Sequence, residues 1–312
     1  MGEGTSKPPV HSYRISGLAV ASQLELLGAI EAPANDDGPD ITVRLQTAPE
    51  TLEGGVAGGP NWEIAGERVL LRVPRVARFL IEGGRHIGVE LEPGATARDA
   101  SIFVLGVSFG ILLHQRGAMV LHGAAVARDG RALAICGASG DGKSTLATAL
   151  CREGFEFVAD DICAVSLDEA RRPVVWPDGR QLKLWREAIE RLDVAARQGA
   201  AVREGIEKYF IGAPASVLAA PRLTAVYVLG EARPPEPEAI LPLNLPDAMR
   251  ALDLQAYRPA IRARIGSKPH NLAQSAAVLS HAPAFRFVRP RGFEHMDRLV
   301  ATLAAHWEAL RR

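Results

Sequence analysis

Nine residues near the middle of the chain are Gly137-Ala138-Ser139-Gly140-Asp141-Gly142-Lys143-Ser144-Thr145, and they fit the pattern G-x-x-x-x-G-K-[ST] at every position. A loop of this kind surrounds the β-phosphate of a nucleotide with backbone N–H groups. Its lysine reaches the β- and γ-oxygens, and its hydroxyl residue holds Mg²⁺. We therefore expect all nine residues to bind ATP or GTP, and Ser144 to bind the metal ion as well.

The residues on either side of this loop have the right character for such a site. Residues 131–136 are apolar after the first and predict a short buried strand, whereas residues 144–152 predict a helix that ends before Gly154. A strand, a glycine-rich loop and a helix in this order direct the helix N-terminus at an anion. The flanks thus support the phosphate-binding interpretation.

The segment upstream of the loop predicts a β-hairpin over residues 119–136. Asp129-Gly130 is a two-residue turn signal between two apolar runs. The loop therefore follows a hairpin, and not the lone first strand of a βαβ array. His122 lies near the start of this hairpin, and a single histidine on an apolar strand is usually a core residue.

Two adjacent carboxylates, Asp160 and Asp161, follow the predicted strand at residues 155–158. Carboxylates at the end of a strand beside a phosphate loop are placed to bind Mg²⁺ or to accept a proton. If the strand geometry continues, the two side chains point to opposite faces. The alternative interpretation is an acidic pair that only opens a turn.

Composition limits the classes of partner and compartment. Lys+Arg and Asp+Glu both number 36 among 312 residues, so nothing favours nucleic acid or an anionic membrane as a partner. Cys136, Cys151 and Cys163 lack metal-ligand spacing and suit a reducing compartment, which predicts a cytoplasmic protein. The most apolar run, residues 102–113, is too short to cross a bilayer and predicts a buried helix.

The chain divides by pattern into three parts. We expect a flexible start over residues 1–10, a strand-rich N-terminal domain over 11–97, and a domain that contains the phosphate loop over 98–312. Alternating apolar residues mark strands in the N-terminal domain. In the second domain we expect a helix over about 98–115 and later helices at 184–197, 245–254 and 295–311.

Within residues 119–165, the loop combines with His122-Gly123 before it and Val158-Ala159-Asp160-Asp161 after it. This combination resembles the HPr kinase/phosphorylase family. The resemblance implies an α/β (α+β) fold, with a P-loop domain like that of HPr kinase and PEP carboxykinase beside a smaller strand-rich N-terminal region. It also implies ATP and Mg²⁺ as cofactors.

By this resemblance, Lys143 contacts the β- and γ-phosphates and Ser144 holds Mg²⁺. Asp160 is the base that takes the proton of a substrate serine, and Asp161 assists it or binds the metal. His122 lies beside the reacting phosphate. Charge neutralisation is expected to dominate catalysis, with a general base adding roughly 10²–10⁴-fold.

The flanking sequence departs from bifunctional HPr kinases, because no Glu-Ile-Arg-Gly-Leu-Gly type segment occurs between residues 165 and 230. It is more similar to a divergent branch that includes lasso-peptide kinases, which phosphorylate a serine of a precursor peptide. The similar segments are Tyr13-Arg-Ile-Ser-Gly-Leu18 with Leu24-Glu-Leu26, Gln115-Arg-Gly117 with Leu121-His122-Gly123, and Leu182-Lys-Leu-Trp185.

The hypothesis is an ATP- and Mg²⁺-dependent serine kinase whose partner is a small protein or a ribosomally made peptide. Related kinases form hexamers, so a homo-oligomer is a further possibility; neither nucleic acid nor membrane is expected to bind. Two alternatives stay open. One is a kinase of the same fold that acts on a small-molecule alcohol, and the other is a nucleotide-gated peptide-binding module without transfer.

Overall fold

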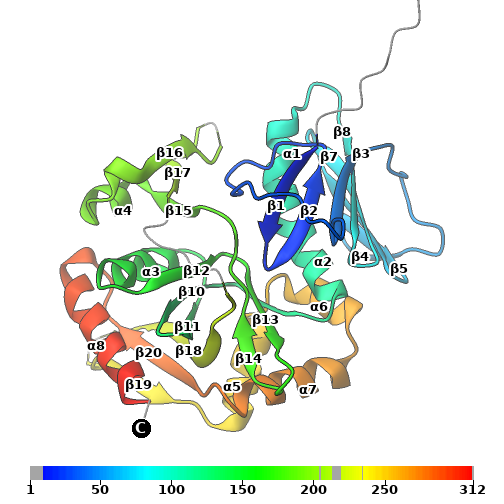
Figure 1. The fold of residues 1–312 in the computed structure, drawn as a ribbon. Helices are drawn as coiled ribbons and strands as arrows, with labels where there is room; N and C mark the ends of the chain where they lie inside the picture. Colours follow the sequence, from blue (N-terminus) through cyan, green and yellow to red (C-terminus); the bar gives the residue numbers. More distant parts are fainter. Residues whose placement is uncertain (1–9, 204, 213–218, 234, 311–312) are drawn as a thin grey trace, which may run out of the picture. The chain divides into compact units, whose positions relative to one another are not determined.

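The computed structural model describes residues 10–203, 205–212, 219–233 and 235–310 (Figure 1). Residues 1–9 of the expected flexible start lie outside this set. The chain forms two compact units, Met1–Arg116 and Gly117–Arg312. The boundary therefore lies after Arg116 and not after residue 97, because the apolar helix that we expected to open the second domain packs within the first unit.

The first unit contains one eight-stranded sheet in the order β1-β2-β3-β8-β7-β6-β5-β4. β3 runs parallel to both β2 and β8, and the other neighbours are antiparallel. This confirms the strand-rich character predicted for the N-terminal region. The strands are β1 His11–Ile15, β2 Leu18–Ser22, β3 Ile41–Leu45, β4 Val56–Gly59, β5 Trp62–Ala65, β6 Arg68–Val73, β7 Ala77–Glu82 and β8 His86–Leu91.

A kinked helix closes the first unit. It consists of α1 (Ala97–Phe103), the π-helical segment η1 (Val104–Ser108) and α2 (Phe109–Gln115), and it contacts β7 and β8. The kink lies at Gly106, whose φ of −90° and ψ of −109° are not helical. Thr96 caps the start of α1 by accepting a hydrogen bond from the Asp99 N–H.

The length of this helix corrects one expectation. By length and composition alone, the 19 residues from Ala97 to Gln115 are enough to cross a membrane. The expectation that this segment is too short to cross a bilayer, which rested on residues 102–113, is therefore wrong. However, 67% of its apolar window is buried inside the protein, and the core helix of a soluble domain passes the same test. The Phe103 ring, for example, lies 6.1 Å from that of Phe79 in the sheet.

The second unit is built on a sheet of nine described strands. Its main path is β12-β10-β11-β18-β14-β13-β9, and β20 pairs with both β18 and β19. β11, β18 and β20 are parallel neighbours, so their C-terminal ends meet at one edge. The strands are β9 Met119–Leu121, β10 Gly123–Arg128, β11 Arg131–Cys136, β12 Glu156–Asp160, β13 Cys163–Leu167, β14 Pro173–Val175, β18 Arg222–Glu231, β19 Ala239–Pro242 and β20 Ala284–Arg289.

Helices cover both faces of this sheet (Figure 1). On one face, α3 (Lys143–Arg152) and α8 (Met296–Ala309) bury side chains such as Leu150 and Trp307. On the other face, α5 (Leu245–Leu254) and α7 (Lys268–Leu279) bury Leu252 and Val278. Successive residues of β10 join opposite cores, as a strand buried on both faces requires. The helix α6 spans Pro259–Ile265.

A small second sheet, β15-β17-β16, replaces part of a predicted helix. We expected residues 184–197 to be helical, but Leu182–Trp185 form β15, and α4 covers only Arg186–Arg191. Leu182 and Leu184 are buried whereas Trp185 is 55% exposed, which is the period of a strand. The remaining elements here are η2 Ala195–Arg197, β16 Gln198–Ala201 and β17 Lys208–Ile211, and η3 (Phe293–His295) precedes α8.

The elements around the glycine-rich loop agree with the sequence predictions. β10 and β11 form the expected hairpin, and both turn residues, Asp129 (φ +53°) and Gly130 (φ +69°), have the left-handed backbone that this turn needs. β11 ends at Cys136, directly before the loop, and α3 ends one residue before Glu153, with Gly154 beyond it. The predicted order of strand, loop and helix is therefore confirmed.

Candidate functional site

The glycine-rich loop joins the end of β11 to the start of α3. Gly140 and Gly142 have φ of +87° and +82°, a backbone that side chains with a Cβ rarely adopt. Gly142 is the N-cap of α3 and offers no capping side chain, so the first-turn N–H groups have no partner from it. An uncapped helix start behind a glycine-rich turn suits a bound anion.

Lys143 is the cation of this loop. Its ammonium is buried and donates to the carbonyl oxygens of Gly137 at 3.0 Å and Ala138 at 2.9 Å. Burial lowers the pKa of Lys143, while the nearby carboxylates of Asp160, Asp141 and Asp161 oppose that shift. The ammonium therefore lies inside the turn, where it can exchange carbonyl partners for phosphate oxygens.

Ser144 and Asp160 are brought together at the base of the loop. The Ser144 hydroxyl donates to Asp160 Oδ1 across 2.7 Å, and the second Asp160 oxygen accepts from the Lys183 N–H at 3.4 Å. Asp160 is the last residue of β12 and is 7% exposed. A hydroxyl and a carboxylate in contact at this position are the protein groups that hold Mg²⁺ in P-loop proteins.

The strand register explains why His122 and Asp161 meet. Ala124 lies opposite Asp160 where β10 pairs with β12, and Leu121 lies opposite Cys163 where β9 pairs with β13. Both pairings belong to one antiparallel register, which is interrupted at residues 122–123 and 161–162. His122 Nδ1 consequently lies 3.2 Å from Asp161 Oδ1 and 3.3 Å from the Asp161 carbonyl oxygen.

Asp161 does not continue the strand. Its φ is +72°, so its carboxylate departs from the line of β12 and is 35% exposed, whereas Asp160 is buried. Burial alone would raise the pKa of Asp161, but the hydrogen bond from His122 and the charges of Lys183 and Arg180 hold it well below the usual range. Asp161 is thus ionised at neutral pH.

A buried ion pair beside the two carboxylates was not found from the sequence. Arg180 Nε lies 2.5 Å from Asp178 Oδ1, and their side chains are 3% and 1% exposed. The other Asp178 oxygen accepts the Asp160 N–H at 3.3 Å, which fixes the end of β12. Lys183, from β15, is a third cation near these carboxylates, after Lys143 and Arg180, and its pKa is lowered by burial and by Arg180. The turn-like composition of residues 168–182 gave no signal for these roles.

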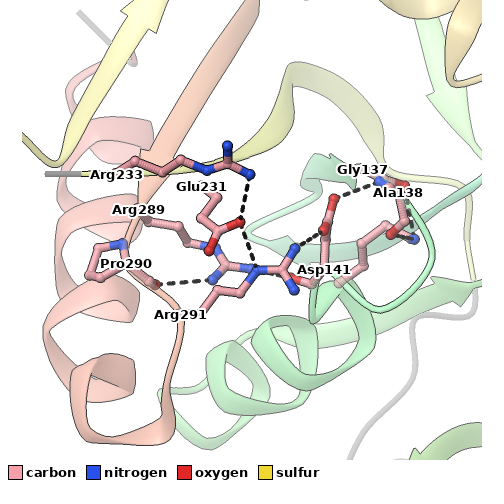
Figure 2. A network of polar contacts seen from close by, with 9 residues as sticks. Gly137, Ala138, Asp141, Glu231, Arg233, Arg289, Pro290 and Arg291 are labelled. Atoms are coloured by element: carbon pink, nitrogen blue, oxygen red, sulfur yellow. Dashed lines mark hydrogen bonds and ion pairs between the residues drawn. The ribbon is translucent and has the colours of Figure 1, made fainter. Parts of the chain in front are cut away.

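Asp141 links the loop to the segment after β20. One of its carboxylate oxygens accepts the Ala138 N–H at 2.7 Å, and the other lies 3.0 Å from Arg291 Nη2. Arg289 donates to the Asp141 carbonyl oxygen, and Glu231 pairs with Arg291 at 3.5 Å (Figure 2). The arrangement ties the outer side of the loop to the C-terminal ends of β18 and β20.

The structure therefore gathers the predicted residues at one place. Lys143, Ser144, Asp160, Asp161 and His122 all lie around the loop and the end of β12. Ser139 lies in the loop, where no described contact gives it a role, and Thr145 lies in the first turn of α3 and borders a cavity beside the loop. Within the described part of the chain, no group of three or more His, Cys, Asp or Glu side chains forms a metal cluster.

No protein-family model matches the chain, and no curated protein matches it. Among solved structures, the chain is similar to the Hpr(Ser) kinase/phosphatase from Coxiella burnetii, with 14% identity and a TM-score of 0.34 over 62% of this chain and 99% of that one. We rest the proposal below on the geometry of the loop and its carboxylates.

Proposed function

We propose that this chain is an ATP- and Mg²⁺-dependent kinase that transfers the γ-phosphate to a serine hydroxyl of a small protein or a ribosomally made precursor peptide. The observation that carries the proposal is the contact between Ser144 and Asp160 under a complete phosphate loop. A loop that only supports the fold has no need of a buried carboxylate on its hydroxyl residue. The resemblance to lasso-peptide kinases supports the choice of a peptide serine.

The loop residues fit a nucleoside triphosphate with Mg²⁺. Glycines at positive φ leave the loop open on the phosphate side, and Lys143 supplies a positive charge within it. Ser144 and Asp160 are the residues that would hold the ion. When bound, Mg²⁺ neutralises charge that develops on the phosphate oxygens during transfer. Lys143 serves the same electrostatic purpose, which is the main contribution in phosphoryl transfer.

Asp161 and His122 are the residues that we assign to the acceptor. In the reaction the serine oxygen forms a bond to the γ-phosphorus, the bond to the β–γ bridging oxygen breaks, and ADP leaves. The proton of the serine passes to a carboxylate. Asp161 is partly exposed and oriented by His122, so its carboxylate can lie beside the acceptor hydroxyl. Its lowered pKa keeps it ionised but makes it a weak base, so it accepts the proton as the bond to phosphorus forms and not before. This assignment differs from the resemblance, which implies Asp160 as the base.

Mass spectrometry tests the function directly. The purified protein is incubated with Mg²⁺-ATP and the peptides encoded beside its gene, and the expected result is a gain of one phosphate on a peptide serine. Lys143→Ala is the matched inactive control. Nucleotide binding without transfer to any peptide would instead favour a small-molecule alcohol as acceptor, or a peptide-binding module. The three free, buried cysteines agree with a reaction in the reducing cytoplasm. Native mass spectrometry would show whether the protein is a homo-oligomer.

A further inference from the structure

A cavity adjoins the outer side of the phosphate loop and is not used by the mechanism above. Its volume is about 360 Å³, within the range of about 300–1,000 Å³ that is usual for small-molecule sites. Gly140, Asp141, Gly142 and Thr145 form its border with the loop. If a ligand binds the loop through its phosphates, the group attached to those phosphates would therefore lie in or next to this cavity.

The walls of the cavity are mainly apolar and aromatic. Leu146 and Leu299 come from the buried core, and Phe293 and Met296 come from the turn before α8 and its first residue. Trp185, at the end of β15, also lines the cavity and is 55% exposed. Flat aromatic surfaces next to a phosphate site suit a purine base, since every base presents a π-face for stacking.

One end of the cavity is cationic. Arg289 lines it and is 92% buried, since 8% of its surface is exposed. Two backbone carbonyl oxygens, of Asp141 and Pro290, accept its hydrogen bonds, and its Nε has no partner. Within the described residues Arg289 forms no ion pair with a carboxylate, unlike its neighbour Arg291. The carboxylates of Asp141 and Glu231 act on Arg289 without forming an ion pair with it, and Glu187 also lines the cavity. A buried guanidinium with no direct carboxylate contact favours an anionic ligand at the loop border.

The segment after β20 is shaped to present these groups. Gly292 has a φ of +120°, a backbone that residues with a side chain rarely adopt, and it lies between Arg291 and Phe293. The turn that Gly292 permits directs Arg291 to Asp141 of the loop, while Phe293 packs against the core cluster below the cavity. Figure 2 shows Arg289 and Arg291 beside the loop at Asp141.

We propose that this cavity binds the nucleoside of the bound nucleotide, with its purine base against Phe293 and Trp185 and the phosphate nearest the ribose beside Arg289. This rests on the proposed function, because it takes the loop to bind a nucleoside triphosphate. It adds a subsite built from β15, β20, η3 and α8, none of which belongs to the phosphate-loop motif.

Binding measurements with two ligands separate this subsite from the loop. Calorimetric titrations with ATP and with inorganic triphosphate are made on the unmodified protein, Phe293→Ala and Trp185→Ala. We expect each variant to bind ATP about 5- to 150-fold more weakly, the range for loss of one base–aromatic stack. Both should bind inorganic triphosphate as the unmodified protein does. Trp176→Ala is the matched control, since Trp176 does not line the cavity.

The outcomes are distinguishable. Unchanged ATP affinity in both variants, with ATP bound by the unmodified protein, would overturn the nucleoside subsite and leave the kinase proposal standing. If the unmodified protein binds neither ATP nor triphosphate, the proposed function itself fails. Phe293 is partly buried, so its variant is checked by thermal unfolding. If it is unstable, the exposed Trp185 decides, because truncating it removes little buried surface.

Discussion

Replacing Asp160 and Asp161 one at a time by asparagine distinguishes metal binding from proton transfer. Asp160 contacts the Ser144 hydroxyl at 2.7 Å in a buried position, whereas Asp161 is partly exposed and contacts His122. If Asp160 acts with Ser144 on Mg²⁺, Asp160→Asn should weaken the effect of the metal on nucleotide binding. Asp161→Asn should leave that effect intact and slow transfer.

The size of the effect follows from the Ser144 contact. A hydrogen bond to a charged acceptor contributes about 1.5–3 kcal/mol, roughly twice a neutral one. Asparagine keeps the shape but removes the charge, and mutating a group that hydrogen-bonds a metal-binding residue, as Asp160 does to Ser144, typically costs about 10–100-fold in metal affinity. We therefore expect the gain in ATP affinity on adding Mg²⁺ to fall by about 10–100-fold in Asp160→Asn. Without Mg²⁺, ATP should bind this variant no more weakly than the unmodified protein, because one negative charge is gone.

The assay is fluorescence titration with a labelled ATP analogue, in Mg²⁺ and in EDTA, followed by single-turnover transfer to the peptide substrate. For Asp161→Asn we expect Mg²⁺-dependent binding within about threefold of the unmodified protein and transfer slowed by about 10²–10⁴-fold. Asp160→Asn with full Mg²⁺-dependent binding and no transfer would refute this reasoning. It would instead support the role implied by the resemblance, with Asp160 as the base.

Three further predictions concern the charges and thiols around the site. Asp161 has a lowered pKa in the folded protein, so its ionised form stabilises the fold above the unfolded pKa of about 3.9, and this stabilisation is lost as the pH falls towards the folded pKa. Urea unfolding should therefore show Asp161→Asn to be less stable than the unmodified protein at pH 7, with a difference that shrinks below about pH 4. A difference that stays constant with pH would contradict the lowered pKa. Asp178→Ala removes the carboxylate of a fully buried ion pair and should lower the free energy of unfolding by about 3–5 kcal/mol. Glu207→Ala, which breaks an exposed pair with Arg186, should change it little. Equal effects would show that the buried pair contributes no more than the exposed one. Burial raises the pKa of Cys136 and of Cys151 to about 12, and Cys163 is buried as well. A thiol reagent at pH 8 should therefore label no cysteine in the native protein and three after unfolding. Rapid labelling of the native protein would show that the core opens.

The elements nearest the loop could be predicted because their signals are local. Asp129-Gly130 determines a turn through its own backbone preferences, and β11 and α3 follow from short apolar patterns next to a fixed motif. The helix expected at residues 184–197 was right for Arg186–Arg191 but wrong at its start, for a non-local reason. Pairing with β17 makes residues 182–185 a strand, and the sequence of this segment does not reveal that partner.

The charged cluster could be predicted only in part. Asp160 and Asp161 were found because they follow a strand at a suggestive distance from the loop. Asp178 and Arg180 were missed because their importance comes from burial, and a turn-rich segment gives no sign that it will be buried. Arg289 was missed for the same reason, because it is buried and the proline that follows it in the sequence gives no sign of that burial. To predict such buried charges, one would have to know which strands end at the same edge of the sheet.

The position of His122 shows how one structural fact connects fold and site. In the sequence this histidine is 39 residues from Asp161 and lies in an apolar hairpin segment. One antiparallel register, which runs from residue 119 to 125 on one side and from 159 to 165 on the other, places the two interruptions opposite each other. Because β10 is buried on both faces, a shift of one residue would move each of its side chains from one core to the other. The packing of these side chains in the two cores therefore also determines the distance between His122 and Asp161. A core substitution that shifted β10 against β12 would remove this contact without altering either residue.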